Sequence, residues 1–113
     1  MKHTMNLNPW PFEAIRSGRK QIEVRLHDEK RSKVRPGDTI EFYKLPDRQE
    51  SLEVEVKELL PFRSFQEMYT SLPLNELDAA GRPVRELLEE TYEIYTPEQE
   101  AKWGVLGIRV SLL

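Results

Sequence analysis

The segment that decides the fold is Gly18-Arg19-Lys20-Gln21-Ile22-Glu23-Val24-Arg25. Apolar residues recur at every second position from Ile22 to Leu26, which predicts a half-buried strand over residues 21–26. The polar face of this strand carries Gln21, Glu23 and Arg25. Charges are usually scattered over the surface of a small domain, so four of them in one short segment indicate a site for an anionic or polar ligand.

Lys20 stands out because it falls on the apolar side of this alternation. We therefore expect it to lie just outside regular strand geometry, or a bulge to turn its side chain. The residues before it predict a short helix over 11–17, with Pro11 at the first helical position and Gly18 as the C-terminal cap. This helix leads the chain into the charged segment.

Alternation and capping signals predict the elements that follow. They are a hairpin of strands over 39–43 and 52–57, a short helix opened by Ser64 and Glu67, a helix over 84–95, a short helix from the cap Thr96 to Trp103-Gly104, and a closing strand over 105–113. Most crossovers are too short for repeated parallel strand-helix-strand units. The sequence therefore predicts an α+β fold, a small mixed β-barrel surrounded by short helices.

The length of 113 residues fits a single domain over 1–113, with 38% hydrophobic residues to form one core. No apolar run approaches the roughly 20 residues that cross a membrane. The first residues also lack the apolar stretch of a signal peptide, so we expect a soluble, cytoplasmic protein with no membrane partner. The oligomeric state is left open.

Metal and redox chemistry find no support in the composition. The chain has no cysteine, which excludes a disulfide, a thiolate nucleophile and a thiolate zinc site. His3 and His27 have no partner at a metal-ligand spacing, and no Gly-rich phosphate loop occurs. We therefore expect no metal and no cofactor.

The net charge of -3 conceals a division along the chain. Residues 16–35 hold eight Lys or Arg against three acidic residues, a balance of +5, which leaves -8 for the remainder. Such asymmetry suits a protein that presents one basic face to a phosphate-bearing partner. A solvated charged loop that binds nothing is the alternative.

Lys20, Glu23 and Arg25 form the candidate site, and three interpretations stay open. Lys20 and Glu23 could act as an acid–base pair in a partly buried cleft. Lys20 and Arg25 could instead grip phosphate oxygens. The third interpretation is a set of ion pairs on the outside of a sheet, each worth at most about 1 kcal/mol.

Aromatic side chains available for stacking on a base are Trp10, Tyr43, Tyr95 and Trp103. Trp10 and Trp103 adjoin helix ends or turns, where side chains can line a cleft, so they are the first candidates for ligand contact. Tyr69 lies on the apolar stripe of its predicted helix and is assigned to the core.

The charged segment resembles the G-x-K-x-x-E-x-R signature of the ASCH domain family. The similarity continues in order along nearly the whole chain, through residues 26–31, 35–38, 64–68 and 103–108. It is strongest with the small stand-alone prokaryotic members. The resemblance implies a PUA-like β-barrel with helices around a cleft into which the signature residues project. It also implies RNA or a modified nucleoside as the ligand. The expected ligand-binding residues are Gly18, Arg19, Lys20, Glu23, Arg25, Trp10 and Trp103.

Hydrolysis is the alternative that the resemblance raises. Some bacterial ASCH proteins are amidohydrolases that act on N4-acetylcytidine with a Lys, a Thr and a Glu, and another branch has ribonuclease activity. Lys20 matches the lysine, but Glu23 occupies the threonine position, and a carboxylate cannot replace a hydroxyl without a change of mechanism. Glu67 and Glu76 both lie in the region of the third residue. The resemblance therefore favours binding, with Lys20 and Glu23 as the catalytic pair of the alternative.

Overall fold

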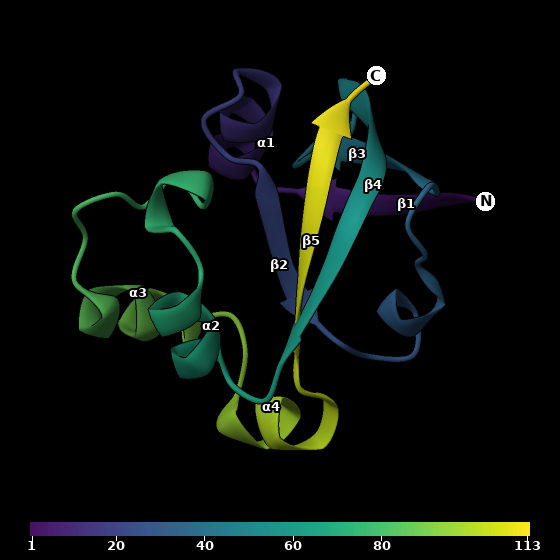
Figure 1. The fold of residues 1–113 in the computed structure, drawn as a ribbon. Coiled ribbons are helices and arrows are strands. Elements are labelled where there is room, and N and C mark those ends of the chain that lie inside the picture. Colours follow the sequence, from purple (N-terminus) through teal and green to yellow (C-terminus); the bar gives the residue numbers. More distant parts are fainter.

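A single curled sheet organises the chain, of which the computed structural model describes residues 1–113 (Figure 1). Its strands are β1 (Lys2–Leu7), β2 (Ile22–Leu26), β3 (Thr39–Lys44), β4 (Ser51–Phe62) and β5 (Val105–Leu112). They lie in the order β1-β3-β4-β5-β2, with β1 parallel to β3 and every other pair antiparallel. The two edges of the sheet are therefore β1 and β2.

The sheet curls along β4, its longest strand. The first residues of β4 pair with β3 alone, Val54 and Glu55 pair with both β3 and β5, and the later residues pair with β5 alone. Between Val56 and Glu58 the register with β5 shifts, and an irregularity of this kind bends a strand and increases its twist. As a result β1 crosses behind β5 at a steep angle (Figure 1), and the sheet forms a half-barrel.

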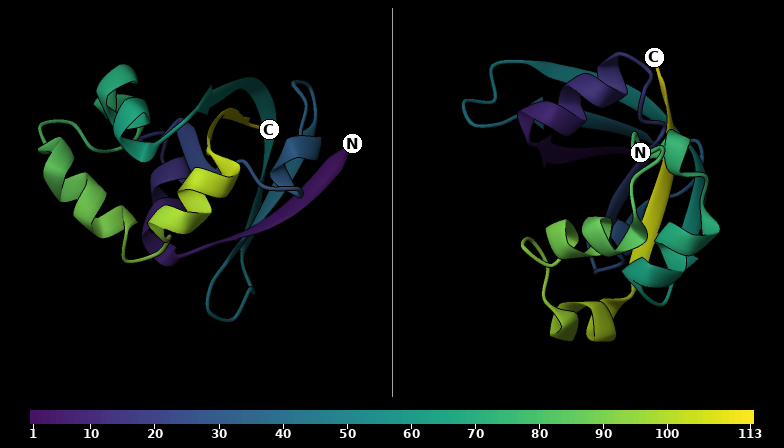
Figure 2. Two further views of the ribbon diagram at one scale, coloured as in Figure 1. Left: turned by 90° about the horizontal axis from the view of Figure 1, so that it is seen from below. Right: turned by 90° about the vertical axis from the view of Figure 1, so that its left-hand side faces the viewer.

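Four helices accompany the sheet: α1 (Pro9–Arg16), α2 (Phe65–Ser71), α3 (Val84–Thr91) and α4 (Pro97–Trp103). Figure 2 shows α2, α3 and α4 gathered at one end of the molecule and α1 at the other. Two 3-10 turns, Arg31–Lys33 and Leu74–Glu76, lie in the connections.

Strand β2 is covered on both faces. Ile22 packs with residues near α3, and Leu26 packs with the buried side chains of α2. On the opposite face, Glu23 pairs in register with Ile108, which belongs to the main core inside the half-barrel. The alternation of β2 therefore separates two interior environments, and its polar face points into the half-barrel rather than to bulk solvent.

The expected α+β fold is confirmed, with corrections at element ends. The hairpin of β3 and β4 and the closing strand β5 lie where the alternation predicts them, although β4 continues to Phe62. The cap Ser64 and the capping box of Thr96 with Gln99 are both present. The predicted helix over 84–95 ends at Thr91, and the helix predicted from Pro11 begins at Pro9. Strand β2 begins at Ile22 rather than at residue 21.

Strand β1 was not predicted from the sequence. Its alternation is present, since Met5 and Leu7 are buried and their neighbours are exposed. Met, His and Asn are not strong strand formers, however, and the strand has only six residues. Its stability comes from a parallel ladder with β3, which lies far along the chain.

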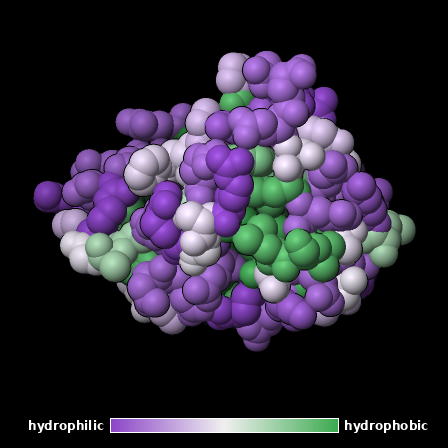
Figure 3. All heavy atoms as spheres, turned by 90° about the horizontal axis from the view of Figure 1, so that it is seen from above, coloured by the Kyte–Doolittle hydropathy of each residue, from purple (hydrophilic) through white to green (hydrophobic).

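One end of the molecule exposes apolar side chains outside the candidate site. Seen from above, the surface is mostly hydrophilic with an apolar strip near its centre (Figure 3). The exposed Leu112 and Leu113 stand at this end, where β5 finishes.

None of the helices combines the length and apolarity needed to cross a bilayer.

Candidate functional site

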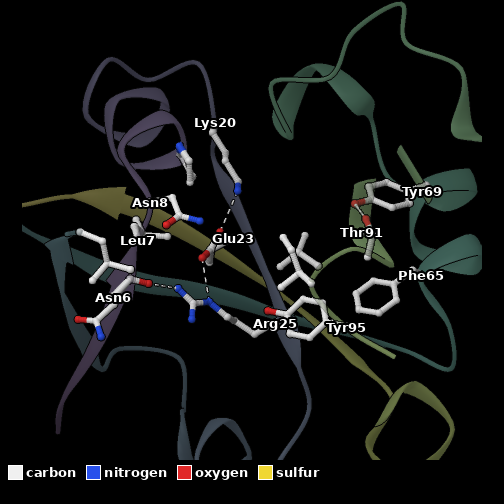
Figure 4. Close-up of a pocket in the computed structure, with 14 residues that line it drawn as sticks. Asn6, Leu7, Asn8, Lys20, Glu23, Arg25, Phe65, Tyr69, Thr91 and Tyr95 are labelled. Carbon is white, nitrogen blue, oxygen red and sulfur yellow. Dashed lines mark hydrogen bonds and ion pairs between the residues drawn. The ribbon is translucent and has the colours of Figure 1, made fainter. Parts of the chain in front are cut away.

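The candidate site is a cavity of about 280 Å³ at the seam between the two edges of the sheet. There Arg25 of β2 donates from Nη2 to the main-chain oxygen of Asn6 in β1 at 2.6 Å. The walls come from the end of β1, the start of α1, β2, the β3–β4 loop, α2 and the end of α3 (Figure 4). The lining residues are Asn6, Leu7, Asn8, Pro11, Lys20, Glu23, Val24, Arg25, Leu45, Phe65, Tyr69, Thr91, Ile94 and Tyr95.

Glu23 is the centre of the charged wall. Lys20 donates from Nζ to Oε1 at 2.8 Å, and Arg25 donates from Nε to Oε2 at 2.9 Å (Figure 4). The three side chains are only 16%, 4% and 13% exposed for Lys20, Glu23 and Arg25 respectively. Burial acts to raise the pKa of Glu23, but the two cations outweigh it and lower this pKa to about 2. The carboxylate is therefore ionised, and the triad carries one net positive charge.

Lys20 lies just outside the strand β2, as expected from its place on the apolar side of the alternation. Its amide donates to Ala14 in α1 at 3.0 Å, and it forms an isolated bridge with Leu77 instead of a strand ladder. The next amide, that of Gln21, donates to Glu76 at 2.8 Å. The chain thus enters β2 from outside the sheet, which allows the Lys20 ammonium to reach Glu23 three residues later.

Aromatic and hydroxyl groups form the wall opposite the triad. Tyr69 and Thr91 hydrogen bond through their hydroxyls at 2.8 Å, and Thr91 donates in turn to the Leu87 carbonyl at 2.8 Å. Because the single Thr91 proton goes to Leu87, Tyr69 is the donor of the pair. Burial raises the pKa of Tyr69 and also that of Tyr95, so both phenols stay neutral at physiological pH.

Tyr95 and Phe65 complete this wall as a stacked pair. Their ring centroids lie 5.5 Å apart with an interplanar angle of 17°. Figure 4 shows the Tyr95 hydroxyl turned toward Arg25, so the aromatic wall and the charged wall meet at this point. The cavity is therefore lined by aromatic rings on one side and by charged groups on the other.

The other candidates from the sequence lie outside this cavity. Gly18 has a φ of 83° and ends α1, a left-handed position that favours glycine. Arg19 stacks over Trp10 at 5.5 Å, and Trp10 is 71% exposed beside a groove of about 170 Å³ next to the cavity. Trp103 packs against the cluster under α2 with Lys102 over its ring. The structure thus brings together Lys20, Glu23 and Arg25 but not these four residues.

Several lining residues were not among the sequence candidates. Asn6 and Asn8 were missed together with β1, and Tyr69 was assigned wholly to the core. Tyr69 shares a helical face with Phe65, which is fully buried, so spacing alone does not separate the core residue from the lining residue. Thr91 gives no sequence signal beyond a polar residue at the end of an amphipathic helix.

The profile of the ASCH domain matches residues 5–113. The chain belongs to the ASCH domain family. The crystal structure of hypothetical protein PH0355 is similar, with 33% identity, a TM-score of 0.88 and full coverage of both chains. The solution structure of protein PF0455 from Pyrococcus furiosus also matches at 33% identity and a TM-score of 0.79, over 100% of this chain and 98% of that one. No curated protein sequence matches significantly. The PUA-like half-barrel expected for an ASCH domain is thus confirmed.

Glu67 and Glu76, the two candidates for the third residue of a hydrolase site, do not line the cavity of this ASCH domain. Glu67 in α2 lies 3.9 Å from Arg63, and Glu76 contacts the guanidinium of Arg109. Glu23 is therefore the one carboxylate among the lining residues. No group of three or more His, Asp or Glu side chains in the structure is arranged to hold a metal ion.

Proposed function

We propose that this ASCH domain binds RNA or a modified nucleoside, with one base in the cavity at the seam. The observation that carries the proposal is the buried Glu23, held between Lys20 and Arg25 and opposite a wall of aromatic rings. The cavity has a volume of about 280 Å³, near the lower end of the roughly 300–1,000 Å³ typical of small-molecule sites. That size suits one nucleoside rather than a larger cofactor.

The triad offers both kinds of hydrogen bond that a base edge requires. The Lys20 ammonium has three donor hydrogens, of which Glu23 takes one, so two remain for a carbonyl or phosphate oxygen. A carboxylate has about four acceptor sites, so Glu23 can still accept from an exocyclic amine while both of its oxygens are paired. Tyr95 and Tyr69 supply the apolar faces on which a base packs.

Hydrolysis receives less support from the same geometry. A general base works best when its pKa lies near the operating pH, whereas the pKa of Glu23 is about 2. Lys20 donates to that carboxylate and is not free to accept a proton in this arrangement. The cavity also contains no second carboxylate to share the work. We therefore give Lys20 and Glu23 binding roles, with an amidohydrolase or ribonuclease as the competing function.

Titration with nucleosides and a short single-stranded RNA tests the proposal. We expect N4-acetylcytidine or an unmodified nucleoside to shift the amide NMR signals of Glu23, Tyr69 and Tyr95. Lys20→Met is expected to weaken the binding, whereas the matched control Lys33→Met, which removes an exposed ammonium without an ion pair, leaves it unchanged. If no nucleoside or RNA binds, or if Lys20→Met binds as the native protein does, the proposal is wrong.

The same samples test the competing function. Mass spectrometry of N4-acetylcytidine and of the RNA after incubation with the protein reports any cleavage directly. Unchanged substrates count against hydrolysis, and turnover that disappears in a folded Lys20→Met variant would establish it in place of simple binding.

A further inference from the structure

Arg48 stands beside the cavity in the loop between β3 and β4. Leu45 of the same loop lines the cavity, and its amide donates to the carbonyl of Leu7 at 2.8 Å, which docks the loop on the end of β1. Arg48 itself donates from Nε to the side-chain oxygen of Asn6 at 3.0 Å. Asn6 is also the residue whose main-chain oxygen accepts from Arg25. One residue therefore connects Arg48 to the charged wall.

The Arg48 guanidinium is held in place with its terminal nitrogens free. It lies 4.5 Å above the ring of Tyr43, and only Nε takes part in a hydrogen bond. No carboxylate pairs with it, since the neighbouring Asp47 accepts from the amide of Gln49 instead. By contrast, the terminal nitrogens of Arg16, Arg82 and Arg109 all contact carboxylates. A guanidinium that is fixed in place and has free terminal nitrogens can bind a phosphate group through bidentate hydrogen bonds.

The main chain at Arg48 adopts a costly conformation. Its φ is 59°, in the left-handed region that favours glycine. Residues other than glycine keep such angles where the surroundings hold them, and they are enriched at ligand sites. Figure 4 shows the Asn6 side chain pointing away from Glu23, so Arg48, which hydrogen bonds to that side chain, lies on the outer side of the seam.

We propose that Arg48 binds a phosphate group of the ligand whose base occupies the cavity. The ligand class is then a nucleotide or an RNA strand rather than a free nucleoside. This inference rests on the proposed function of the cavity. It adds that the phosphate of the ligand lies on the side of the cavity formed by the loop between β3 and β4. The phosphate belongs either to the bound nucleotide itself or to its neighbour in a strand.

Binding of cytidine, N4-acetylcytidine, their 3′- and 5′-monophosphates and a short mixed-sequence RNA tests the inference. The affinities are measured by calorimetry for the native protein, Arg48→Gln, Arg48→Lys and the control Arg63→Gln, in which the altered side chain is 96% exposed and lines no part of the cavity. We expect Arg48→Gln to weaken phosphate-bearing ligands about tenfold and nucleosides hardly at all. Arg48→Lys should recover part of the loss, because it keeps the charge but not the fork.

The source of the phosphate follows from which ligands respond. A loss confined to one monophosphate assigns the contact to the bound nucleotide, and a loss seen only with RNA assigns it to a neighbouring one. In the RNA case the slope of log affinity against log salt should also decrease by about 0.7.

Failure of the inference and failure of the proposed function give different results. If native protein binds nucleosides, their monophosphates and RNA equally, or if Arg48→Gln and Arg63→Gln behave alike toward all of these ligands, Arg48 binds no phosphate while the cavity still binds the base. If neither nucleosides, nucleotides nor RNA bind the native protein, both are wrong.

Discussion

Arg25 and Asn6 join the two edges of the sheet through one hydrogen bond, in which Nη2 donates to the main-chain oxygen at 2.6 Å. The strands that carry them, β2 and β1, share no ladder, so their outer backbone groups have no strand partner at this seam. The same guanidinium uses Nε for the Glu23 carboxylate. Arg25 therefore holds the half-barrel together and shapes the floor of the cavity at once.

Replacing this guanidinium by an ammonium should loosen the seam. A lysine at position 25 can reach Glu23 or the Asn6 carbonyl but lacks the fork that reaches both. We expect Arg25→Lys to lower the free energy of unfolding by about 1–2 kcal/mol and to accelerate amide exchange at the end of β1. Hydrogen exchange followed by NMR measures both effects. Arg109→Lys on β5 is the matched control, and equal exchange at Leu7 in the two variants would contradict the role given to Arg25.

The negative charge of Glu23 should contribute to stability, because it compensates two largely buried cations, Lys20 and Arg25. Glu23→Gln keeps the volume but leaves Lys20 and Arg25 without their counter-charge, which should cost about 3 kcal/mol of unfolding free energy. In the double variant Lys20→Met, Glu23→Gln one of the two uncompensated charges is also gone. Its loss should therefore be smaller than the sum of the two single losses. Urea unfolding gives these values, and strictly additive losses would show that the two side chains are not coupled.

Acid should remove the contribution of Glu23 over a defined range of pH. Folding lowers the pKa of Glu23 from 4.5 to about 2, so its stabilisation is fully present above pH 4.5 and is lost as the pH falls toward 2. The amount is about 3 kcal/mol for a shift of this size. Asp38, whose pKa is also lowered to about 2 by hydrogen bonds from His3 and the amino terminus, titrates in the same range in every variant.

Comparison with Glu23→Gln isolates this one carboxylate. The melting temperature of the native protein should fall more steeply between pH 4.5 and 2 than that of the variant, and the two curves should converge at the acid end. Parallel curves would mean that Glu23 is not held at a low pKa in the folded state.

The sequence predicts the charged wall of the site but not the seam. Alternation from Ile22 to Leu26 places Glu23 and Arg25 on one face of the strand. The position of Lys20 on the apolar side of this alternation correctly predicts that Lys20 lies outside the strand. Their convergence on a buried site depends on β5, from the far end of the chain, whose Ile108 pairs with Glu23 and joins that face of β2 to the main core. Local patterns carry no information on such pairings, and β1 was missed for the same reason.

The aromatic wall also depends on contacts that local patterns do not specify. Helical spacing predicted that one helix continues to residue 95, but it ends at Thr91. The turn that follows carries Tyr95 back onto Phe65, where the two rings stack. Tyr95 thus lines the cavity because the helix stops early, and tertiary packing rather than periodicity decides that stop.

Stacking on Tyr95 should dominate the binding of the base. One base stacked on an aromatic ring is worth about 1–3 kcal/mol, so Tyr95→Leu should weaken nucleoside binding by about 5- to 150-fold. Tyr95→Phe keeps the ring and should bind nearly as well as the native protein. Calorimetric affinities, compared with melting temperatures to confirm folding, distinguish the two. A leucine variant with native affinity would place the base elsewhere in the cavity.

Arg48 offers a test of whether this chain gives up stability for binding. The left-handed φ of 59° costs an ordinary residue about 1 kcal/mol, and glycine avoids that cost. Arg48→Gly and Arg48→Gln both remove the guanidinium, along with its contacts to Asn6 and Tyr43. The glycine variant should therefore be more stable than the glutamine variant by about 0.5–1 kcal/mol in urea unfolding, since its more flexible unfolded chain offsets part of the gain. Both should lose the same affinity for phosphate-bearing ligands. If the two variants unfold at the same urea concentration, the conformation at this position is not strained, and the loop does not hold Arg48 at a cost.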